Sequence, residues 1–164
     1  MGGYSKFGKN SVAAKTWTGL STHNTITLSF KAYYIDTWDN ETYVAYADGT
    51  RVYYDLFEPI TSSYFCGRVA TIKDVTLTDI VHSSSSLTLE FTTGLDSDAY
   101  DESFGVSNLV ITVCDSACQG CTSGSPSVCV SCPSSKYLSR GSCVSTCPDD
   151  QYPSSNTNVC NGKL

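Results

Sequence analysis

Apolar and polar side chains alternate along much of residues 1–113. Between Ile26 and Tyr34 every second residue is apolar or aromatic, and this period of two predicts a β-strand with one buried face. Six further short segments rich in aliphatic or aromatic residues are also predicted to be strands: 11–17, 42–48, 51–57, 70–79, 86–93 and 105–113. No segment has the 3.6-residue period of a helix. This pattern predicts a mostly β fold, an antiparallel β-sandwich or jelly roll.

The dipeptide Asp48-Gly49 joins two of these segments and predicts a tight turn. Asp-Gly favours hairpin turns in which both central residues have positive φ. Segments 42–48 and 51–57 are therefore expected to pair as neighbouring antiparallel strands.

The composition changes at Cys114. Residues 1–113 hold one cysteine, Cys66, whereas residues 114–164 hold eight, separated by Pro, Gly and Ser and by few aliphatic side chains. About 50 residues of that composition bury too little apolar surface to fold without covalent cross-links. We therefore expect a β-sandwich domain over residues 1–113, followed by a small disulfide-rich module over residues 114–164.

The cysteine spacing is compatible with two kinds of site. Two Cys-x2-Cys pairs, beginning at Cys118 and Cys129, offer the four thiolates of a zinc site. The gap between them is short for such a site, and four further cysteines would have no role. A disulfide framework uses all eight, so we predict an oxidising compartment and a secreted or cell-surface protein. Because no signal sequence follows Met1, we expect one upstream of these residues.

The same spacing resembles a known family. Cys-x3-Cys-x2-Cys-x7-Cys-x2-Cys from Cys114, followed by Cys-x3-Cys-Pro from Cys143, is similar to the furin-like repeat of growth-factor-receptor cysteine-rich regions. The resemblance covers residues 114–160 and implies a rod-like spacer or contact module, not a catalyst. It also implies four disulfides: Cys114–Cys121, Cys118–Cys129, Cys132–Cys143 and Cys147–Cys160.

Cys66 has no partner in this scheme. One interpretation is a buried free thiol that packs as a small apolar side chain. The other is a disulfide to a cysteine outside these residues or in another chain, as an odd cysteine in an exported protein indicates. The sequence leaves both open.

The negative charge lies in residues 1–113, which carry 7 Lys and Arg against 13 Asp and Glu. A formal net charge of −6, with ten cationic side chains in all, argues against nucleic acid and anionic membranes as partners. No apolar run is long enough to span a bilayer, so we expect no membrane insertion within these residues.

Two acidic clusters, within residues 36–41 and 96–102, each lie in a loop before a predicted strand. Oxygen ligands on two loops suit Ca²⁺, which takes about six to eight oxygens. The alternative is a solvated acidic rim that only aids solubility. We expect calcium, with no organic cofactor, and the following ligands: Asp36, Asp39, Glu41, Asp101 and Glu102.

Residues 1–113 carry a second resemblance. Its motifs are Gly2-Gly3-Tyr4, the stretch 34–41, Asp48-Gly49, Cys66-Gly67 and the stretch 101–106. They resemble a domain of large protist, especially ciliate, surface proteins, similar in outline to galactose-binding-like and lectin-like sandwiches. In such proteins furin-like repeats typically follow this domain. Phe104 stands where the family usually has tryptophan, which weakens the case for a stacking platform there.

Asn40-Glu41-Thr42 is an N-glycosylation sequon inside the first acidic cluster. Exported surface loops often carry glycans at such sites, so Asn40 is a candidate glycosylation site. A glycan at this position can compete with cation binding.

Neither His23 nor His82 belongs to a catalytic motif, and the chain has no nucleophile elbow, HExxH or Gly-rich phosphate loop. We therefore expect that the protein is not an enzyme.

In a β-strand, alternate side chains point to opposite faces, so some of the tyrosines are expected to point outward, where they can contact glycans or protein. The tyrosines around the first acidic cluster are Tyr33, Tyr34, Tyr43, Tyr46, Tyr53, Tyr54 and Tyr64.

These observations predict a non-enzymatic structural and adhesive module of a coat, matrix or filament. Its expected partners are copies of itself or other surface or matrix proteins. A calcium-dependent carbohydrate-binding adhesion module, with glycans as partners, is the alternative.

Overall fold

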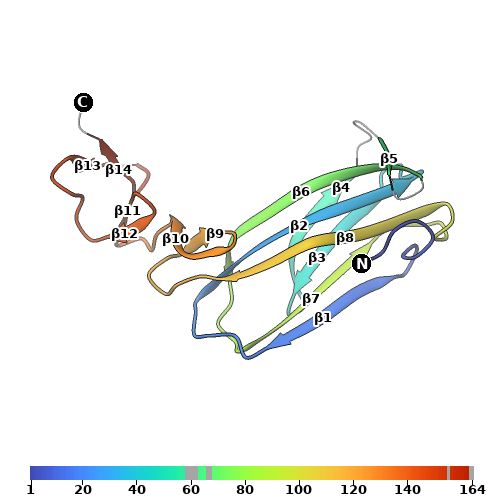
Figure 1. Ribbon diagram of the computed structural model, residues 1–164, viewed down its shortest axis with the longest axis horizontal. Helices are drawn as coiled ribbons and strands as arrows, with labels where there is room; N and C mark the ends of the chain where they lie inside the picture. Colours follow the sequence, from blue (N-terminus) through green and yellow to red (C-terminus); the bar gives the residue numbers. More distant parts are fainter. Residues whose placement is uncertain (58–62, 66–67, 155, 163–164) are drawn as a thin grey trace. The chain divides into compact units, whose positions relative to one another are not determined.

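The computed structural model describes residues 1–57, 63–65, 68–154 and 156–162. These residues form β-strands and no helix, so the predicted mostly β fold is confirmed (Figure 1). Within those ranges nothing has the length and apolar character of a membrane-spanning helix. Cys66 lies outside the described residues.

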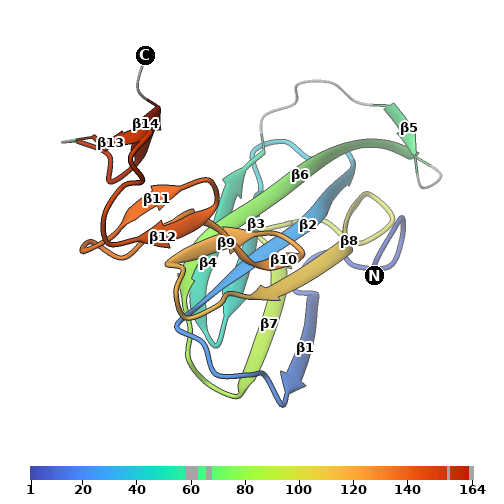
Figure 2. The same ribbon diagram turned by 60° about the vertical axis from the view of Figure 1, so that its left-hand side comes forward.

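Two four-stranded sheets form the larger part of the fold (Figure 2). The first sheet has the order β1 (Val12–Thr18), β7 (Ser86–Thr93), β3 (Thr42–Ala47) and β4 (Thr50–Leu56). The second has the order β5 (Ser63–Phe65), β6 (Arg68–Val81), β2 (Thr25–Asp36) and β8 (Glu102–Val113). Each predicted strand is present, and the short strand β5 is additional.

The contacts divide the chain into two compact units. Unit 1 comprises Met1–Gly19, Ser29–Val75 and Ser86–Leu109. Unit 2 comprises Leu20–Leu28, Thr76–Ser85 and Val110–Leu164, and so combines the cysteine-rich residues with one end each of β2, β6 and β8. The predicted domain limits, 1–113 and 114–164, stay a prediction.

Aromatic side chains from the two sheets meet in the core of unit 1. Phe30 on β2 packs edge-on against Phe91 on β7, with ring centroids 5.1 Å apart. Tyr43 on β3 packs edge-on against Phe104 on β8 at 5.8 Å. All four side chains are almost completely buried. The predicted sandwich is therefore confirmed.

The turn between β3 and β4 has the predicted conformation. Asp48 and Gly49 have φ values of 47° and 75°, the positive values that favour Asp-Gly in a hairpin turn. The register pairs Ala47 with Thr50 across this turn.

Three two-stranded hairpins form the cysteine-rich part of unit 2. They are β9 (Gly120–Thr122) with β10 (Ser125–Ser131), β11 (Tyr137–Ser139) with β12 (Ser142–Val144), and β13 (Gln151–Pro153) with β14 (Cys160–Gly162). Four disulfides cross-link them: Cys114–Cys121, Cys118–Cys129, Cys132–Cys143 and Cys147–Cys160. These are the pairs that the furin-like resemblance implies, and they leave no thiolate of residues 114–164 for zinc.

Candidate functional site

The acidic clusters lie in the loops that connect β2 to β3 and β7 to β8. Asp36, the last residue of β2, has a φ of 74°, and Asn40 has a φ of 85°. Asp and Asn adopt this left-handed backbone more readily than most residues. These two residues allow the chain to turn sharply between β2 and β3.

Hydrogen bonds tie the two loops together. Thr37 donates to the carbonyl oxygen of Asp101 from its backbone N–H, at 3.5 Å, and from Oγ1, at 3.2 Å. The buried indole of Trp38 donates from Nε1 to the carbonyl oxygen of Ser103 at 2.8 Å. Segments more than 60 residues apart in the sequence therefore meet in a defined arrangement within unit 1.

Three carboxylates meet between these loops: Asp39, Glu41 and Glu102, named here the acidic triad. One oxygen of each lies within 4.8 Å of the others. Asp39 is exposed, whereas Glu41 and Glu102 expose only 9% and 4% of their surface. The backbone N–H of Asp39 donates to Glu41 Oε2 at 2.5 Å. Glu102 Oε2 is buried without a hydrogen-bond partner among the described residues.

Burial raises the pKa of both glutamates, because a carboxylate loses hydration when it leaves water. The negative charge of Glu41 raises the pKa of Glu102 further, while a hydrogen bond from the backbone of Ser97 lowers it. For Glu41, the hydrogen bond from the backbone of Asp39 opposes the effect of burial. Three adjacent carboxylates, two of them buried, need either protons or a cation to offset their mutual repulsion.

The other two predicted ligands have different partners. Asp36 Oδ2 forms an ion pair with Nε of Arg68 at 3.4 Å. Asp101 Oδ1 accepts a hydrogen bond from Thr37 Oγ1 at 3.1 Å. The structure therefore brings together three of the five predicted residues, and a calcium role for any of them stays a prediction.

The predicted tyrosines divide between the interior and the surface. Tyr34 and Tyr43 are buried, and burial raises the pKa of both phenols. Tyr54 is 52% exposed, and the guanidinium of Arg51 lies 5.1 Å from its ring centre. Tyr33 and Tyr46 are half-buried, and the side chain of Tyr64 is outside the description. Tyr54 thus provides an aromatic surface beside a cation.

The two histidines lie together in unit 2, 59 residues apart in the sequence. Nε2 of His23 is 2.6 Å from Nδ1 of His82, and Nδ1 of His23 is 2.5 Å from the carbonyl oxygen of Ser21. Both rings are buried and stacked. The sequence contains no local pattern that marks this pair.

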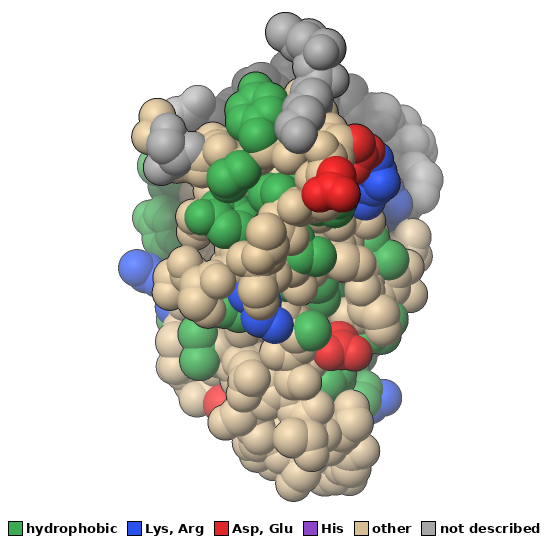
Figure 3. Space-filling view, turned by 90° about the vertical axis from the view of Figure 1, so that its left-hand side faces the viewer, with side chains coloured by type: hydrophobic (Ala, Val, Ile, Leu, Met, Phe, Trp, Pro, Cys, Tyr) green, Lys and Arg blue, Asp and Glu red, His purple; other side chains and the backbone are tan. Residues whose placement is uncertain are grey.

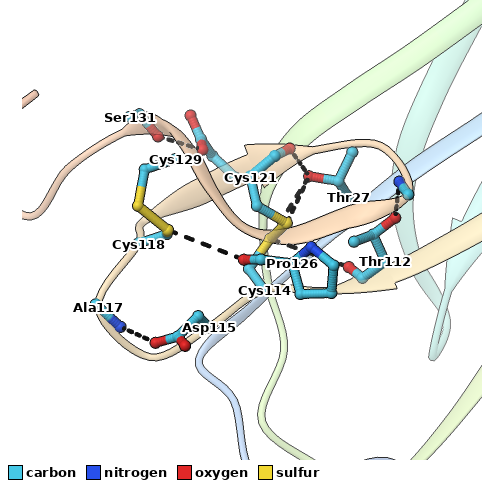
Figure 4. The surroundings of a disulfide bond; sticks show 12 residues. Thr27, Thr112, Cys114, Asp115, Ala117, Cys118, Cys121, Pro126, Cys129 and Ser131 are labelled. Atoms are coloured by element: carbon cyan, nitrogen blue, oxygen red, sulfur yellow. Dashed lines mark hydrogen bonds between the residues drawn. A yellow bond between two sulfur atoms is a disulfide. The ribbon is translucent and has the colours of Figure 1, made fainter. Parts of the chain in front are cut away.

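The first disulfide lies against strand ends within unit 2 (Figure 4). Thr27 on β2 donates from Oγ1 to the carbonyl oxygen of Cys121 at 2.8 Å, and neither residue exposes any surface. Thr112 on β8 accepts a hydrogen bond at Oγ1 from the backbone N–H of Gly124 at 2.7 Å. We call these contacts, together with that of Asp79 below, the strand–disulfide junction.

Asp79 on β6 completes this junction. Its Oδ1 accepts a hydrogen bond from Ser131 Oγ at 2.6 Å. A Cβ atom at Gly120 would lie 1.8 Å from the same oxygen, so any larger residue there would displace the Asp79 side chain. The alternation between Ile26 and Tyr34 predicts that Thr27 lies on the polar face of its strand, but the structure buries Thr27 against Cys121. A polar residue inside a strand gives no signal of what covers it.

Comparisons with known proteins give partial matches. No family model matches the chain. Over 47 residues it is 43% identical to human Proprotein convertase subtilisin/kexin type 5, a match that covers 29% of this chain and 2% of that protein. Crystalline dimeric latent PorU from Porphyromonas gingivalis is similar over 68% of this chain and 12% of that chain, with 13% identity and a TM-score of 0.39.

The chain thus spans a small fraction of the curated relative that it matches. This relative and the four disulfides fit a furin-like cysteine-rich module in residues 114–164. The same observations indicate an extracellular or secreted module.

Proposed function

We propose that the chain is a non-enzymatic structural and adhesive module of an extracellular coat, matrix or filament, stabilised by calcium. The strand–disulfide junction is the observation that carries this proposal. It joins the β9–β10 hairpin to the ends of three strands by one buried and two partly buried hydrogen bonds. A cysteine-rich hairpin held rigidly against strand ends is suited to a structural role, in which the module keeps its protein-contact surfaces in a fixed position.

Buried hydrogen bonds make such a junction resistant to opening. Opening it would leave the carbonyl oxygen of Cys121 and the hydroxyl of Thr27 to be rehydrated. An unmade buried hydrogen bond costs about 1–3 kcal/mol. Two partly buried hydrogen bonds, Gly124 to Thr112 and Ser131 to Asp79, accompany the buried one, and we therefore expect this point to resist local opening, as a load-carrying role requires.

Exposed apolar side chains offer contact surfaces for assembly. Val128 and Val130 on β10 expose 47% and 43% of their surface, on the same side of the strand, while Cys129 between them is buried. On the face drawn in Figure 3, uncharged side chains and backbone cover most of the surface, with hydrophobic side chains among them and few charged ones. Exposed apolar surface favours protein contacts. The proposed partners are copies of this chain or other surface or matrix proteins.

Two further features support the proposal. Both ring nitrogens of His23 are in polar contacts inside unit 2, one with His82 and one with Ser21, an arrangement that favours packing over catalysis. Residues 1–113 resemble the lectin-like domains of ciliate-type surface proteins, which fits the same role. The calcium component rests on the acidic triad.

Electron microscopy of the purified full chain in Ca²⁺ buffer tests the proposal. We expect ordered assemblies that become more abundant as protein concentration rises. The variant V128T/V130T keeps side-chain size but adds hydroxyls, and should assemble less. V12T makes the same change at a residue with 55% exposure on β1 and serves as the matched control. Dispersed single particles at every concentration would contradict the structural role.

A calcium-dependent carbohydrate-binding module is the second candidate function. The exposed ring of Tyr54, with Arg51 beside it, favours this candidate because sugars stack on aromatic faces and hydrogen-bond to neighbouring polar groups. A glycan array with and without chelator distinguishes it from the first. Chelator-sensitive binding that Y54A abolishes would support it, and no binding across a broad array would count against it.

A further inference from the structure

We infer that the acidic triad of Asp39, Glu41 and Glu102 holds one Ca²⁺ ion between the β2–β3 and β7–β8 loops of unit 1. The inference rests on the calcium component of the proposed function and assigns it to three residues. It also separates them from Asp36 and Asp101, which have other partners.

Glu102 gives the strongest argument. Its side chain is 96% buried, and Oε2 has no hydrogen-bond partner among the described residues. A buried polar atom without a partner is costly, and most such atoms in proteins have one. The neighbouring side-chain oxygens of Asp39 and Glu41 belong to carboxylates, which accept hydrogen bonds and donate none when ionised. The missing partner must therefore be positive or carry a proton.

The ligand set selects the kind of cation. It consists of carboxylate oxygens alone, which suit the hard cations Ca²⁺ and Mg²⁺. Mg²⁺ requires near-ideal octahedral geometry and gives up water reluctantly, whereas Ca²⁺ accepts irregular sets that mix mono- and bidentate carboxylates with water. Three carboxylates drawn from two loops, one of them exposed, fit the less demanding ion.

The loops are prepared for binding before any ion arrives. Thr37 donates a hydrogen bond to Asp101 in the β7–β8 loop, and Trp38 donates one to Ser103 at the start of β8, so the first loop is already held in place. Little loop entropy is then lost on binding, which favours affinity. The ion would in turn pin two segments that lie far apart in the sequence.

Asn40 lies between two triad residues in the sequence but is itself exposed. Glu41, beside it, points inward and is buried. We therefore expect a glycan on Asn40 to extend into solvent, away from the buried carboxylate of Glu41. Enzymatic removal of such a glycan is expected to leave calcium affinity unchanged.

Terbium luminescence on the full chain tests the site. Tb³⁺ takes the same oxygen ligands as Ca²⁺ and emits when a nearby tryptophan is excited; Trp38 precedes Asp39 directly. At pH 7.4 we expect emission that Ca²⁺ displaces. E102Q should weaken Ca²⁺ binding at least about tenfold, since it removes a buried ligand charge. E90Q makes the same chemical change on β7 and should leave binding intact.

D39N provides a second variant, because Asp39 is exposed and its replacement leaves the packing undisturbed. It should also weaken binding. Saturation at about 100 times Kd should raise the wild-type Tm by about 5–10 °C. Wild-type affinity in both E102Q and D39N, or no emission because the triad stays protonated, would overturn the inference. Assembly that persists without Tb³⁺ binding would refute only the calcium site, whereas binding without assembly would refute only the structural role.

Discussion

The hydroxyl of Thr27 donates a hydrogen bond to the carbonyl oxygen of Cys121 at 2.8 Å, across 94 residues of sequence and with no exposed surface on either residue. This bond links a sheet strand to the first disulfide. The strand segment that contains Thr27 and the cysteine-rich residues therefore belong to the same compact unit, although their compositions differ.

Replacement of Thr27 by valine is expected to destabilise the protein by about 1–3 kcal/mol, because the Cys121 carbonyl oxygen would stay buried without its donor. Guanidinium denaturation under non-reducing conditions measures the loss. T27S keeps the hydroxyl and serves as the control, with a smaller loss from the missing methyl group. Wild-type stability of T27V would show that the hydrogen bond contributes nothing.

Gly120→Ala is expected to cost about 1–3 kcal/mol, because its Cβ would overlap Asp79 Oδ1 and displace the hydrogen bond from Ser131. A methyl group added at Gly162 would meet no atom within 4 Å, and the φ of this glycine is not positive, so G162A is the matched control. Thermal unfolding distinguishes the two. A G120A protein as stable as G162A would contradict the close approach of Asp79.

The acidic triad makes stability depend on pH when calcium is removed by a chelator. Burial raises the folded-state pKa of Glu102 above its ordinary value of 4.5. The folded state then binds more protons than the unfolded state, so stability falls as pH rises from about 4.5 through the raised pKa. E102Q lacks this titration. As pH rises, the Tm of the wild type should therefore fall relative to that of E102Q. Saturating Ca²⁺ should oppose this fall in the Tm of the wild type. Parallel Tm curves for the two proteins would argue against a raised pKa.

The disulfides are expected to differ in their rate of reduction, because thiolate attack requires access to sulfur. Cys114 and Cys121 expose 1% and 0% of their surface, whereas Cys132 and Cys143 are both half-buried. Limited reduction followed by alkylation and peptide mapping should find Cys132–Cys143 opened first and Cys114–Cys121 opened last. T27V should hasten reduction of the first pair. Simultaneous loss of both pairs in the wild type would contradict this order.

Much of the fold could be predicted from local pattern. Alternation located the main strands, and Asp48-Gly49 identified the β3–β4 turn, because both depend on neighbours in the sequence. The order of strands in each sheet could not be predicted, since β1 pairs with β7 across a long separation. The cysteine pairs follow the family resemblance and not the spacing alone.

The sequence could predict which loops carry the candidate site, but not which carboxylates in those loops lie together. Loop composition indicated where carboxylates gather. It could not show that Arg68 pairs with Asp36, or that Thr37 binds Asp101, because both contacts depend on tertiary structure. For the same reason the burial of Glu102 could not be predicted from a residue that looks like part of an exposed acidic loop.

Sedimentation velocity of the intact chain over a concentration series in Ca²⁺ buffer tests the proposed structural role most directly. We predict a sedimentation coefficient that rises with protein concentration, and a shift toward the monomer in V128T/V130T but not in V12T. A single monomeric species at every concentration would contradict the account.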